Sequence, residues 1–322
     1  TVTDADVTLG AIDPARFAGG SIQLAPERSV RALNDALGRT LGFPSEQAAF
    51  GIAEVVEENM ANAARVHAVE RGKELGGRTM IAFGGAAPLH AANLAQKLDI
   101  ARVVVPSGAG VGSAVGFLMA PVAYEVVRSR FMALDQTFDA QAVNAIRAEM
   151  RAEAEAIVRL GAPTGVLEAH WTADMRYHGQ GHDITITIPG DALEAASAKS
   201  LAASFEAEYV KTFGMTIPGM HVEVMSWALR LAAAAPPVPP LPAAPTSYAA
   251  SPATHRDLYN PDTGAFDSVP LYWRFDLRPG ATLHGPAIIA EDETSTLVTA
   301  RYNASINALG YIVLERAMRE SA

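Results

Sequence analysis

Two short apolar segments frame residues 80–106, which read MIAFGGAAPLHAANLAQKLDIARVVVP. The first, TMIAF, and the second, ARVVVP, are rich in β-branched residues without alternation, which is the pattern of strands covered on both faces. Between them, Pro88 suits a first helical turn, and apolar residues at helical spacing predict a helix of about three turns. The sequence therefore predicts a βαβ unit with parallel strands and a right-handed crossover.

A glycine pair, Gly84 and Gly85, follows the first predicted strand. Backbone N–H groups and a helix N-terminus at this edge of a sheet are typical of nucleotide binding. The sequence lacks both standard phosphate-binding loops. A P-loop needs Lys-Ser or Lys-Thr after its second glycine, and Ser113 replaces the third glycine that Gly108 and Gly110 need for a dinucleotide motif.

Two interpretations of the glycine pair stay open. In the first, Gly84 and Gly85 form a tight turn and nothing more. In the second, they let a flat base or ribose lie against the main chain, and the small Ala86 and Ala87 keep that approach free. His90 lies in the first turn of the predicted helix, either as a packing residue or as a group that faces the same edge.

A long amphipathic helix is predicted over residues 45–71, ending near a glycine. Its predicted buried face consists of the apolar residues spaced three and four apart, which are Ile52, Val56, Met60, Ala63 and Val66. Polar side chains, among them Asn59 and a predicted surface pair of Arg65 with Glu70, occupy the opposite face. That face is either solvated or lines a cleft.

A second polar stretch, MRYHGQGHDITI, places His178 and His182 four residues apart. On a helix this spacing would suit a metal, but the glycines between the two histidines argue against a helix and thus against zinc. Alternation instead predicts two strands around this loop. Arg176 and Asp183 flank it, and they either hold an anion, orient an imidazole or pair with each other.

Three adjacent carboxylates, Glu291, Asp292 and Glu293, are interpreted as a solvated turn between two strands. No serine lies in a Gly-x-Ser-x-Gly motif, so a hydrolase triad has no support. The sequence has no cysteine, which excludes thiol nucleophiles, disulfides and thiolate-zinc sites.

The rest of the chain predicts a mixture of helices, strands and one linker. A single helix is expected in PERSVRALNDALGRTLG, a small-residue helix near Ser113, a helix over 137–160, a helix over 191–213 and a strand over 221–231. The predicted organisation is an α/β lobe over 1–135, an α+β segment over 136–231, a Pro/Ala-rich linker over 232–253 and a β-rich terminal module over 254–322.

The composition limits the partners and the compartment. A net charge of -10 with scattered Lys and Arg gives no reason to expect nucleic acid or an anionic membrane as a partner. No apolar run approaches the roughly 20 residues of a membrane span, and a cysteine-free sequence fits the cytoplasm. The chain begins at Thr1 without an initiator Met, so we expect a piece of a longer protein or a processed product.

Five blocks, in this order, resemble the carboxyl-terminal half of the hydantoinase A/5-oxoprolinase family. They are TVTDADVTLG, NMANAARVHAVERG, IAFGGAAPLHAANLA, VVVPSGAGVGSAVGFLMA and DMRYHGQGHDITI. The resemblance extends to GPAIIAEDETSTLV and covers nearly the whole chain. It is specific for the family, which includes hydantoin, lactam and oxoproline hydrolases and ketone carboxylase subunits, and it leaves the substrate open.

The resemblance implies an actin-like ATPase fold of the sugar kinase and Hsp70 type, in which two α/β lobes close over ATP. The segment that matches the adenosine motif is residues 83–90, and residues 112–116 match the connecting helix. The candidate cofactor-binding residues are therefore Gly84, Gly85, Ala86, Ala87, Pro88, His90, Asn59 and Ser113. The family's phosphate-binding loops and Mg²⁺ ligands belong to the other half, so this chain is expected to hold the nucleoside end of ATP.

The implied activity is ATP-dependent activation of a carbonyl or amide oxygen by phosphorylation, for ring opening or carboxylation of a small carbonyl compound. The implied partners are the amino-terminal half or a sister subunit and a hydantoinase B-like subunit; no catalytic residue is assigned. Two departures are Ala87, where the family usually has glycine, and Ala68, where it often has serine. A methyl group at residue 87 would crowd a nucleotide, which keeps open a non-catalytic assembly subunit with a degenerate site.

Overall fold

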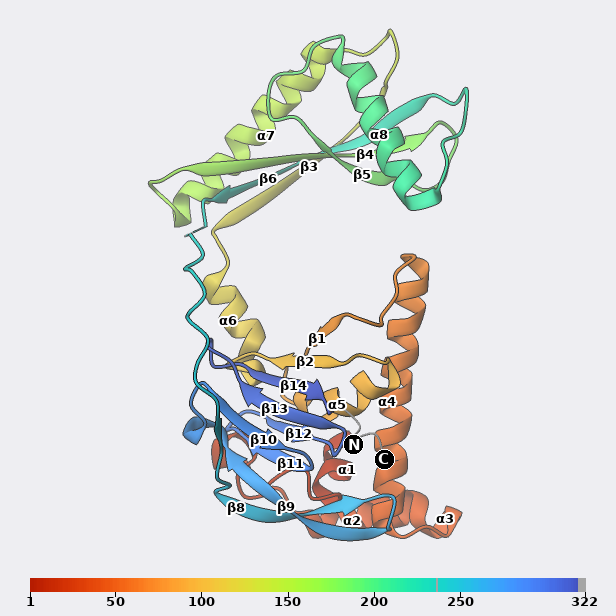
Figure 1. Ribbon diagram of the computed structural model, residues 1–322. Coiled ribbons are helices and arrows are strands. Elements are labelled where there is room, and N and C mark those ends of the chain that lie inside the picture. The colour runs from red at the N-terminus through yellow and green to blue at the C-terminus, as the bar shows by residue number, and fades with distance from the viewer. Residues whose placement is uncertain (236, 318–322) are drawn as a thin grey trace. The chain divides into compact units, whose positions relative to one another are not determined.

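The computed structural model describes residues 1–235 and 237–317. They form two compact units, with unit 1 comprising Thr1–Leu118 and the chain from Pro239 onward, and unit 2 comprising Met119–Val238 (Figure 1). The predicted division at residues 135, 231 and 253 stays a prediction. Residue 236 of the predicted linker and residues 318–322 of the predicted terminal module lie outside the described residues.

The main sheet of unit 1 has six strands in the order β1-β2-β14-β13-β10-β7. Their bounds are Thr79–Ile81 for β1, Arg102–Val105 for β2, Ile312–Arg316 for β14, Tyr302–Ile306 for β13, Ala281–His284 for β10 and Tyr248–Ala249 for β7. β1 and β2 are parallel and are joined through helix α5 (Ala87–Lys97), which confirms the predicted βαβ unit. β14 pairs with β2 in antiparallel fashion, so the sheet is mixed.

Strand β1 differs from the strand covered on both faces that its composition predicted. It lies at the edge of the sheet, with β2 as its one neighbour in the strand order, and Ile81 is 62% exposed. β2 is covered on one face more than on the other, because Val103 and Val105 are buried whereas Arg102 is exposed and Val104 is half-buried. The two apolar runs therefore predicted the strands correctly but not coverage of both of their faces.

A second sheet of unit 1 has four strands in the order β12-β11-β9-β8. Their bounds are Ser295–Val298 for β12, Ala287–Ala290 for β11, Ala265–Trp273 for β9, which a 3-10 turn at Arg274–Asp276 follows, and Thr254–Asn260 for β8. Helix α5 contacts β2 of the first sheet and β12 of the second. One buried cluster joins the small face of this helix to both sheets through Val103, Ile289 and Val298.

The carboxyl-terminal β-rich segment contributes strands to both sheets of unit 1. Its last described strand, β14, lies between β2 and β13 in the main sheet. Leu314 is completely buried there and stands opposite the equally buried Val103. The physical reason is that β2 has a second edge to pair, and an apolar strand more than 200 residues later satisfies its backbone groups.

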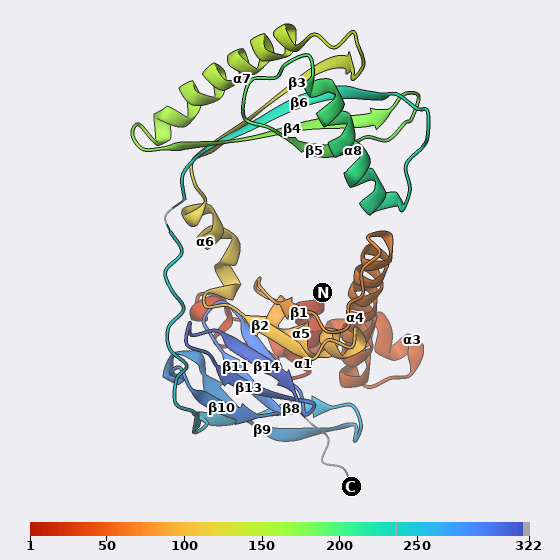
Figure 2. The same ribbon diagram turned by 45° about the horizontal axis from the view of Figure 1, so that its top comes forward.

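The remaining helices of unit 1 precede or flank the sheets (Figure 2). They are α1 (Val2–Thr8), α2 (Pro26–Leu33), α3 (Arg39–Leu41), α4 (Ser45–Glu70) and α6 (Gly112–Met119), with 3-10 turns at Phe17–Gly20 and Ala109–Val111. A π-helical stretch at Asn34–Gly38 connects α2 to α3, so the single helix predicted there is confirmed with one widened turn. The 26-residue α4 confirms the predicted long helix.

The face of α4 that is buried was predicted wrongly. Met60 is 36% exposed and Val66 is 57% exposed. The buried positions are mostly alanines, namely Ala48, Ala49, Ala53, Ala61 and Ala68, together with Ser45 and Glu57. Small residues on this face let α1 and α5 approach α4 closely. The face with the small side chains is therefore the buried one, and the face with the larger apolar side chains is not.

Unit 2 is a four-stranded antiparallel sheet in the order β3-β6-β4-β5, packed against two helices. The strands are Ala123–Ala133 for β3, Val222–Ala233 for β6, Leu167–Tyr177 for β4 and Ile184–Ile188 for β5, and the helices are α7 (Ala140–Gly161) and α8 (Ser197–Phe213). These elements confirm the predicted strand pair and helices. The largest fully buried side chain in its core is that of Trp227.

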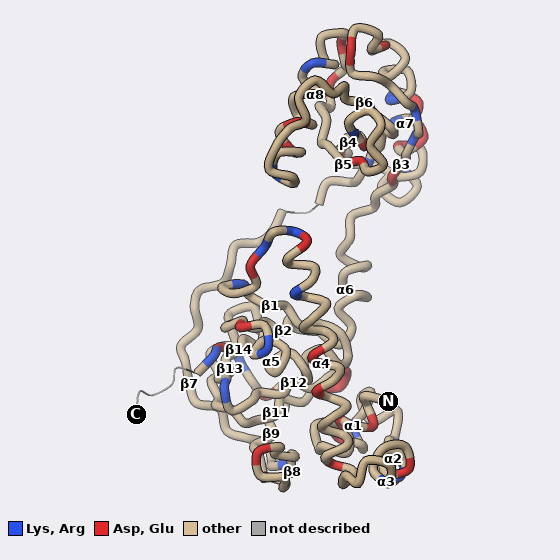
Figure 3. The backbone as a smooth tube through the Cα atoms, turned by 90° about the vertical axis from the view of Figure 1, so that its right-hand side faces the viewer, with Lys and Arg blue, Asp and Glu red and all other residues tan. Residues whose placement is uncertain are grey.

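Charged residues are distributed over both units. Figure 3 shows Lys and Arg interspersed with Asp and Glu along the chain trace, in keeping with the net charge of -10. Among the described residues, no helix combines the length and the apolar character that crossing a membrane requires.

Candidate functional site

The glycine turn after β1 is fixed by hydrogen bonds to two distant segments. The Gly84 N–H donates to the carbonyl oxygen of Ala109 at 2.7 Å, which ties the turn to the loop after β2. The Gly85 carbonyl accepts a 2.8 Å bond from the Thr294 hydroxyl, which ties it to the loop between β11 and β12. Gly84 has φ +117°, a conformation that side chains disfavour.

The carboxylate turn at 291–293 packs against these glycines. A Cβ on Gly110 would lie 2.4 Å from the Glu293 Cβ, and one on Gly85 would lie 3.7 Å from the Glu293 carbonyl oxygen. The Glu291 side chain is buried, so the prediction of a solvated turn was wrong for this residue. Burial raises the pKa of Glu291, and the nearby Arg274 opposes that rise.

Packing within the protein thus explains why residue 110 is a glycine, but it does not explain the glycine at residue 84. No described atom lies within 4 Å of the position that a Cβ of Gly84 would take. Ala86 and Ser113 are exposed, and Phe83 is 56% exposed. Because Gly112 packs against Phe83, the start of α6 lies next to the turn. The open surface formed by Phe83, Gly84, Ala86 and Ser113 is called the Gly84 face below.

The N-terminus of α5 belongs to the same edge of the sheet. Ala86 is its N-cap residue, and no side chain caps the helix. Pro88 lies in the first turn and is buried, whereas Ala87 is half-buried. Uncapped N–H groups and the positive end of a helix dipole favour hydrogen-bond acceptors and negative charge at this place.

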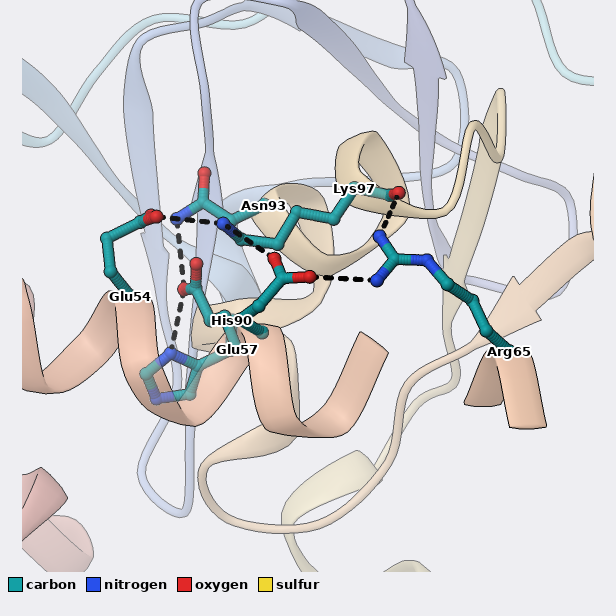
Figure 4. Close-up of polar contacts among 7 residues, drawn as sticks. Glu54, Glu57, Arg65, His90, Asn93 and Lys97 are labelled. Atoms are coloured by element: carbon teal, nitrogen blue, oxygen red, sulfur yellow. Dashed lines mark hydrogen bonds and ion pairs between the residues drawn. The ribbon is translucent and has the colours of Figure 1, made fainter. Parts of the chain in front are cut away.

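The side chain of His90 lies in a buried cluster between α5 and α4 (Figure 4). Its Nδ1 lies 3.1 Å from Oε1 of Glu57 on α4, and its Nε2 lies 3.5 Å from Oδ2 of Asp6 on α1. The Asn93 amide donates to the same Glu57 oxygen at 3.1 Å. The imidazole therefore joins α5, the helix that follows the glycine turn, to α1 and α4.

Two buried carboxylates determine the charge of His90. Burial lowers the pKa of this imidazole, but the ion pair with Asp6 and the hydrogen bond to Glu57 outweigh burial and raise the pKa to about 9. Glu57 is 1% exposed and Asp6 is 4% exposed, so an imidazolium between them compensates charge that water does not reach. The ring is consequently protonated at neutral pH.

A second polar network holds α4 to α5 at the surface. Arg65 donates to Glu58 at 2.8 Å and to the Lys97 carbonyl oxygen at 2.9 Å (Figure 4). Lys97 donates to Glu54 at 2.8 Å. The predicted pair of Arg65 with Glu70 was therefore wrong, because Arg65 reaches the other helix instead of the end of its own.

The structure brings only part of the predicted site together. Gly84, Gly85, Ala86 and Ala87 form one edge with Pro88 and Ser113 beside them. Asn59 is an exposed residue of α4. It follows the buried Glu57 by two positions, about 200° around the helix, so it points away from the face that meets α5.

In unit 2 the predicted polar stretch forms a β-hairpin loop anchored by Glu223. Arg176 Nε donates to Oε1 of this carboxylate at 2.6 Å, and His178 Nδ1 lies 2.8 Å from its Oε2. Glu223 is 2% exposed. Burial raises its pKa, but the bonds from His178 and Arg176 outweigh burial and lower the pKa overall.

The two histidines of this loop do not share a helix face. His178 directly follows β4, and His182 precedes β5. Within residues 1–235 and 237–317, no group of three or more His, Cys, Asp or Glu side chains is arranged to hold a metal ion.

The family relationship follows from sequence models. The model described as "Hydantoinase/oxoprolinase" matches residues 1–126, and that of the "Hydantoinase/oxoprolinase C-terminal domain" matches residues 135–316. This chain belongs to the hydantoinase/oxoprolinase family. The predicted resemblance is thereby confirmed.

Relatives of this family member include the acetophenone carboxylase gamma subunit of Aromatoleum aromaticum, 30% identical over 98% of this chain and 44% of the relative. The caprolactamase alpha subunit of Pseudomonas jessenii is 28% identical over 95% of this chain and 45% of the relative. The chain thus spans less than half the length of these two relatives.

Solved structures support the same fold. The ATP-dependent caprolactamase of Pseudomonas jessenii superposes with a TM-score of 0.76 at 26% identity, covering 99% of this chain and 47% of that one. Nucleotide-free acetone carboxylase gives a TM-score of 0.77 at 24% identity, covering 98% of this chain and 46% of that one. The predicted α/β fold of the actin-like ATPase class is confirmed.

Sequence reasoning missed two buried carboxylates that bind several side chains, Glu57 in unit 1 and Glu223 in unit 2. For Glu57 a signal was available, because it interrupts a row of alanines at 49, 53, 61 and 68 on one helix face. A charged residue in such a row predicts a buried partner. For Glu223, the strand alternation placed it on the polar face and gave no reason to expect burial.

Proposed function

We propose that the Gly84 face binds the adenosine portion of ATP, and that the chain is part of an ATP-dependent amidohydrolase or carboxylase. The observation that carries this proposal is Gly84 itself. Its backbone requires glycine, its Cβ position is open, and it follows a strand at the carboxyl edge of a parallel pair.

The residues of the Gly84 face fit a nucleoside. Phe83 offers an exposed apolar ring for stacking on a base, Ser113 offers a hydroxyl, and the bare main chain at Gly84 allows close approach of a flat group. His90 acts here as a positioning residue, because its bonds to Asp6 and Glu57 hold the helix that follows the turn. ATP, when bound, supplies a phosphoryl group for activating a carbonyl or amide oxygen.

The family relatives suggest the reaction class. The relatives include an ATP-dependent caprolactamase, an acetone carboxylase that acts with ATP, and an acetophenone carboxylase subunit. Each of these names contains a carbonyl compound, either a lactam or a ketone. For this chain we propose a small carbonyl substrate and Mg²⁺ that is bound by residues outside the chain. The proposed partners are the remaining part of such an enzyme and a hydantoinase B-like subunit.

Isothermal titration of the chain with adenosine, ADP and ATP tests the proposal. Because the chain is proposed to contact only the nucleoside end, the three ligands should bind within about tenfold of one another, a span of about 1.4 kcal/mol. Gly84→Ala should abolish binding of all three. Gly264→Ala is the matched control, since Gly264 also has positive φ and open space at its Cβ position.

Two outcomes contradict the proposal. Binding that is unaffected by Gly84→Ala places the nucleotide elsewhere. Failure of all three adenine compounds to bind, both to the chain and to its native complex, favours the alternative of a non-catalytic assembly subunit. The methyl group of Ala87 is the observation on the side of that alternative, because it lies next to the turn.

A further inference from the structure

Helix α4 has an exposed side that consists of uncharged residues. Five of them follow one another at intervals of three or four positions, which aligns them along the helix, namely Val55, Asn59, Asn62, Val66 and Val69. All five are exposed, with exposed fractions of 61%, 57% and 77% for the three valines. They lie on the side opposite the buried Glu57, and we call them the outer face of α4.

The charged residues of the same stretch are engaged in contacts with α5. Lys97 on α5 binds Glu54 at 2.8 Å and lies 3.7 Å from Glu58, which accepts a bond from Arg65. These contacts leave the outer face without an ionic group. A surface helix normally presents charged side chains to water, whereas a helix with apolar residues on opposite sides is a buried one. The outer face therefore has the composition of a contact surface.

Strand β1, which follows α4 after residues 71–78, has a free edge. Within the described parts of the chain, β2 is the one strand paired with β1. β1 and the carboxyl-terminal end of α4 lie at the same end of unit 1 in both ribbon views (Figures 1 and 2). The residues of β1, Thr79–Ile81, include no proline and no charged side chain, which usually protect an exposed edge against pairing. The edge of β1 is therefore suited to accept a further strand.

The size of the relatives indicates what covers these two features. This chain accounts for 46% and 47% of the two solved chains that it resembles, so more than half of each lies outside the matched region. A second copy of this chain fits less well, because each copy has a net charge of -10 and the outer face offers no basic group to offset the repulsion. An additional part of the same enzyme is thus the better candidate.

We propose that the outer face of α4 and the free edge of β1 form one docking surface for the amino-terminal part of the enzyme. That part supplies apolar side chains that bury the three valines, polar groups for the two asparagine side chains, and a strand that pairs with β1. The inference rests on the proposed partnership with the remaining part of the enzyme. It does not depend on nucleotide binding at the Gly84 face.

Thermal unfolding of two proteins tests the docking surface, namely this chain and the complete enzyme that includes the amino-terminal part. Val66→Asp should change the Tm of the chain by no more than about 2 °C, because the side chain is exposed there. In the complete enzyme the carboxylate would be buried without a partner, and Tm should fall by at least about 4 °C. An equal shift of Tm in both proteins would overturn the proposal.

Leu41→Asp is the matched control. Leu41 is 54% exposed and belongs to α3, outside the docking surface. This variant should have the same small effect on Tm in both proteins. A fall in the complete enzyme as large as that of Val66→Asp would mean that any exposed apolar residue gives this result, and it would contradict the assignment of the outer face.

Hydrogen exchange measured by mass spectrometry tests the role of β1 without any substitution. The amides of Thr79–Ile81 that face the free edge should exchange at least tenfold more slowly in the complete enzyme than in this chain. Equal exchange rates in the two proteins would refute the pairing of a further strand with β1.

Sedimentation equilibrium of the chain tests the rival occupant. A dimer of the chain that Val66→Asp dissociates would overturn the proposal in favour of a second copy. A native protein that is purified without any amino-terminal part would contradict the proposed partnership itself. A complete enzyme that is insensitive to Val66→Asp would contradict the docking surface alone, so the two failures are distinguishable.

Discussion

Replacing His90 with glutamine should destabilise unit 1 in a manner that depends on pH. The folded protein raises the pKa of this imidazole to about 9 from its ordinary value of 6.5. Each tenfold difference in proton affinity between folded and unfolded chain corresponds to about 1.4 kcal/mol, so protonated His90 contributes about 3 kcal/mol to the free energy of unfolding. Glutamine keeps an N–H donor but carries no charge.

The sign of the pH dependence follows from the raised pKa. The contribution is complete below pH 6.5, declines as the pH rises through the interval up to about 9, and is absent above it. His90→Gln should therefore be about 3 kcal/mol less stable than the wild type at pH 6, and the charge-dependent part of this difference should vanish near pH 9.5. For a unit of this size, about 3 kcal/mol lowers Tm by roughly 6–12 °C.

Differential scanning calorimetry at half-unit intervals from about pH 6 to 9.5 measures this difference. His67→Gln, at an exposed position of α4, is the matched control and should show no such trend. A difference between wild type and His90→Gln that stays constant across the range would refute the reasoning, because it would show that His90 stabilises the fold by shape or hydrogen bonding and not by its charge.

Two further predictions concern packing and buried charge, each measured by urea unfolding. Glu223→Gln should destabilise unit 2 by about 2 kcal/mol at neutral pH, and because the pKa of Glu223 is lowered this loss should shrink as the pH falls through that pKa, whereas Glu168→Gln on the exposed part of β4 should have no effect. Gly110→Ala should cost about 1–3 kcal/mol because its methyl group would meet the main chain of Glu293; Gly116→Ala, inside α6 with open space, should be neutral or stabilising, and equal effects of the two variants would contradict this account.

Local patterns predicted the local structure well. The βαβ unit could be predicted because the strand composition, the glycine turn and Pro88 all lie within one short segment and act on neighbouring residues. The strand pair around the unit 2 loop could be predicted for the same reason. Apolar and polar residues alternate along these strands because one face of the sheet is buried and the other is not.

Long-range packing explains what the patterns missed. The buried face of α4 depends on how closely α1 and α5 approach, and hydrophobic spacing does not report the distance between helices. Glu291 is buried in a loop whose Glu293 and Thr294 contact Gly110 and Gly85, which lie some 200 residues earlier in the chain. His90 was a candidate for the site because of its position after the turn, and only its contacts with Asp6 and Glu57 indicate a supporting role.

The location of β14 in the main sheet has a consequence for how the chain acquires its structure during synthesis. β1, α5 and β2 leave the ribosome early, but the strand that pairs with the second edge of β2 follows the whole of unit 2. Unit 2 is one continuous segment, so it can fold first, while β2 retains an unpaired edge that invites pairing with other chains. Premature termination before β14 should therefore yield an aggregation-prone product, even though every residue of the Gly84 face would be present.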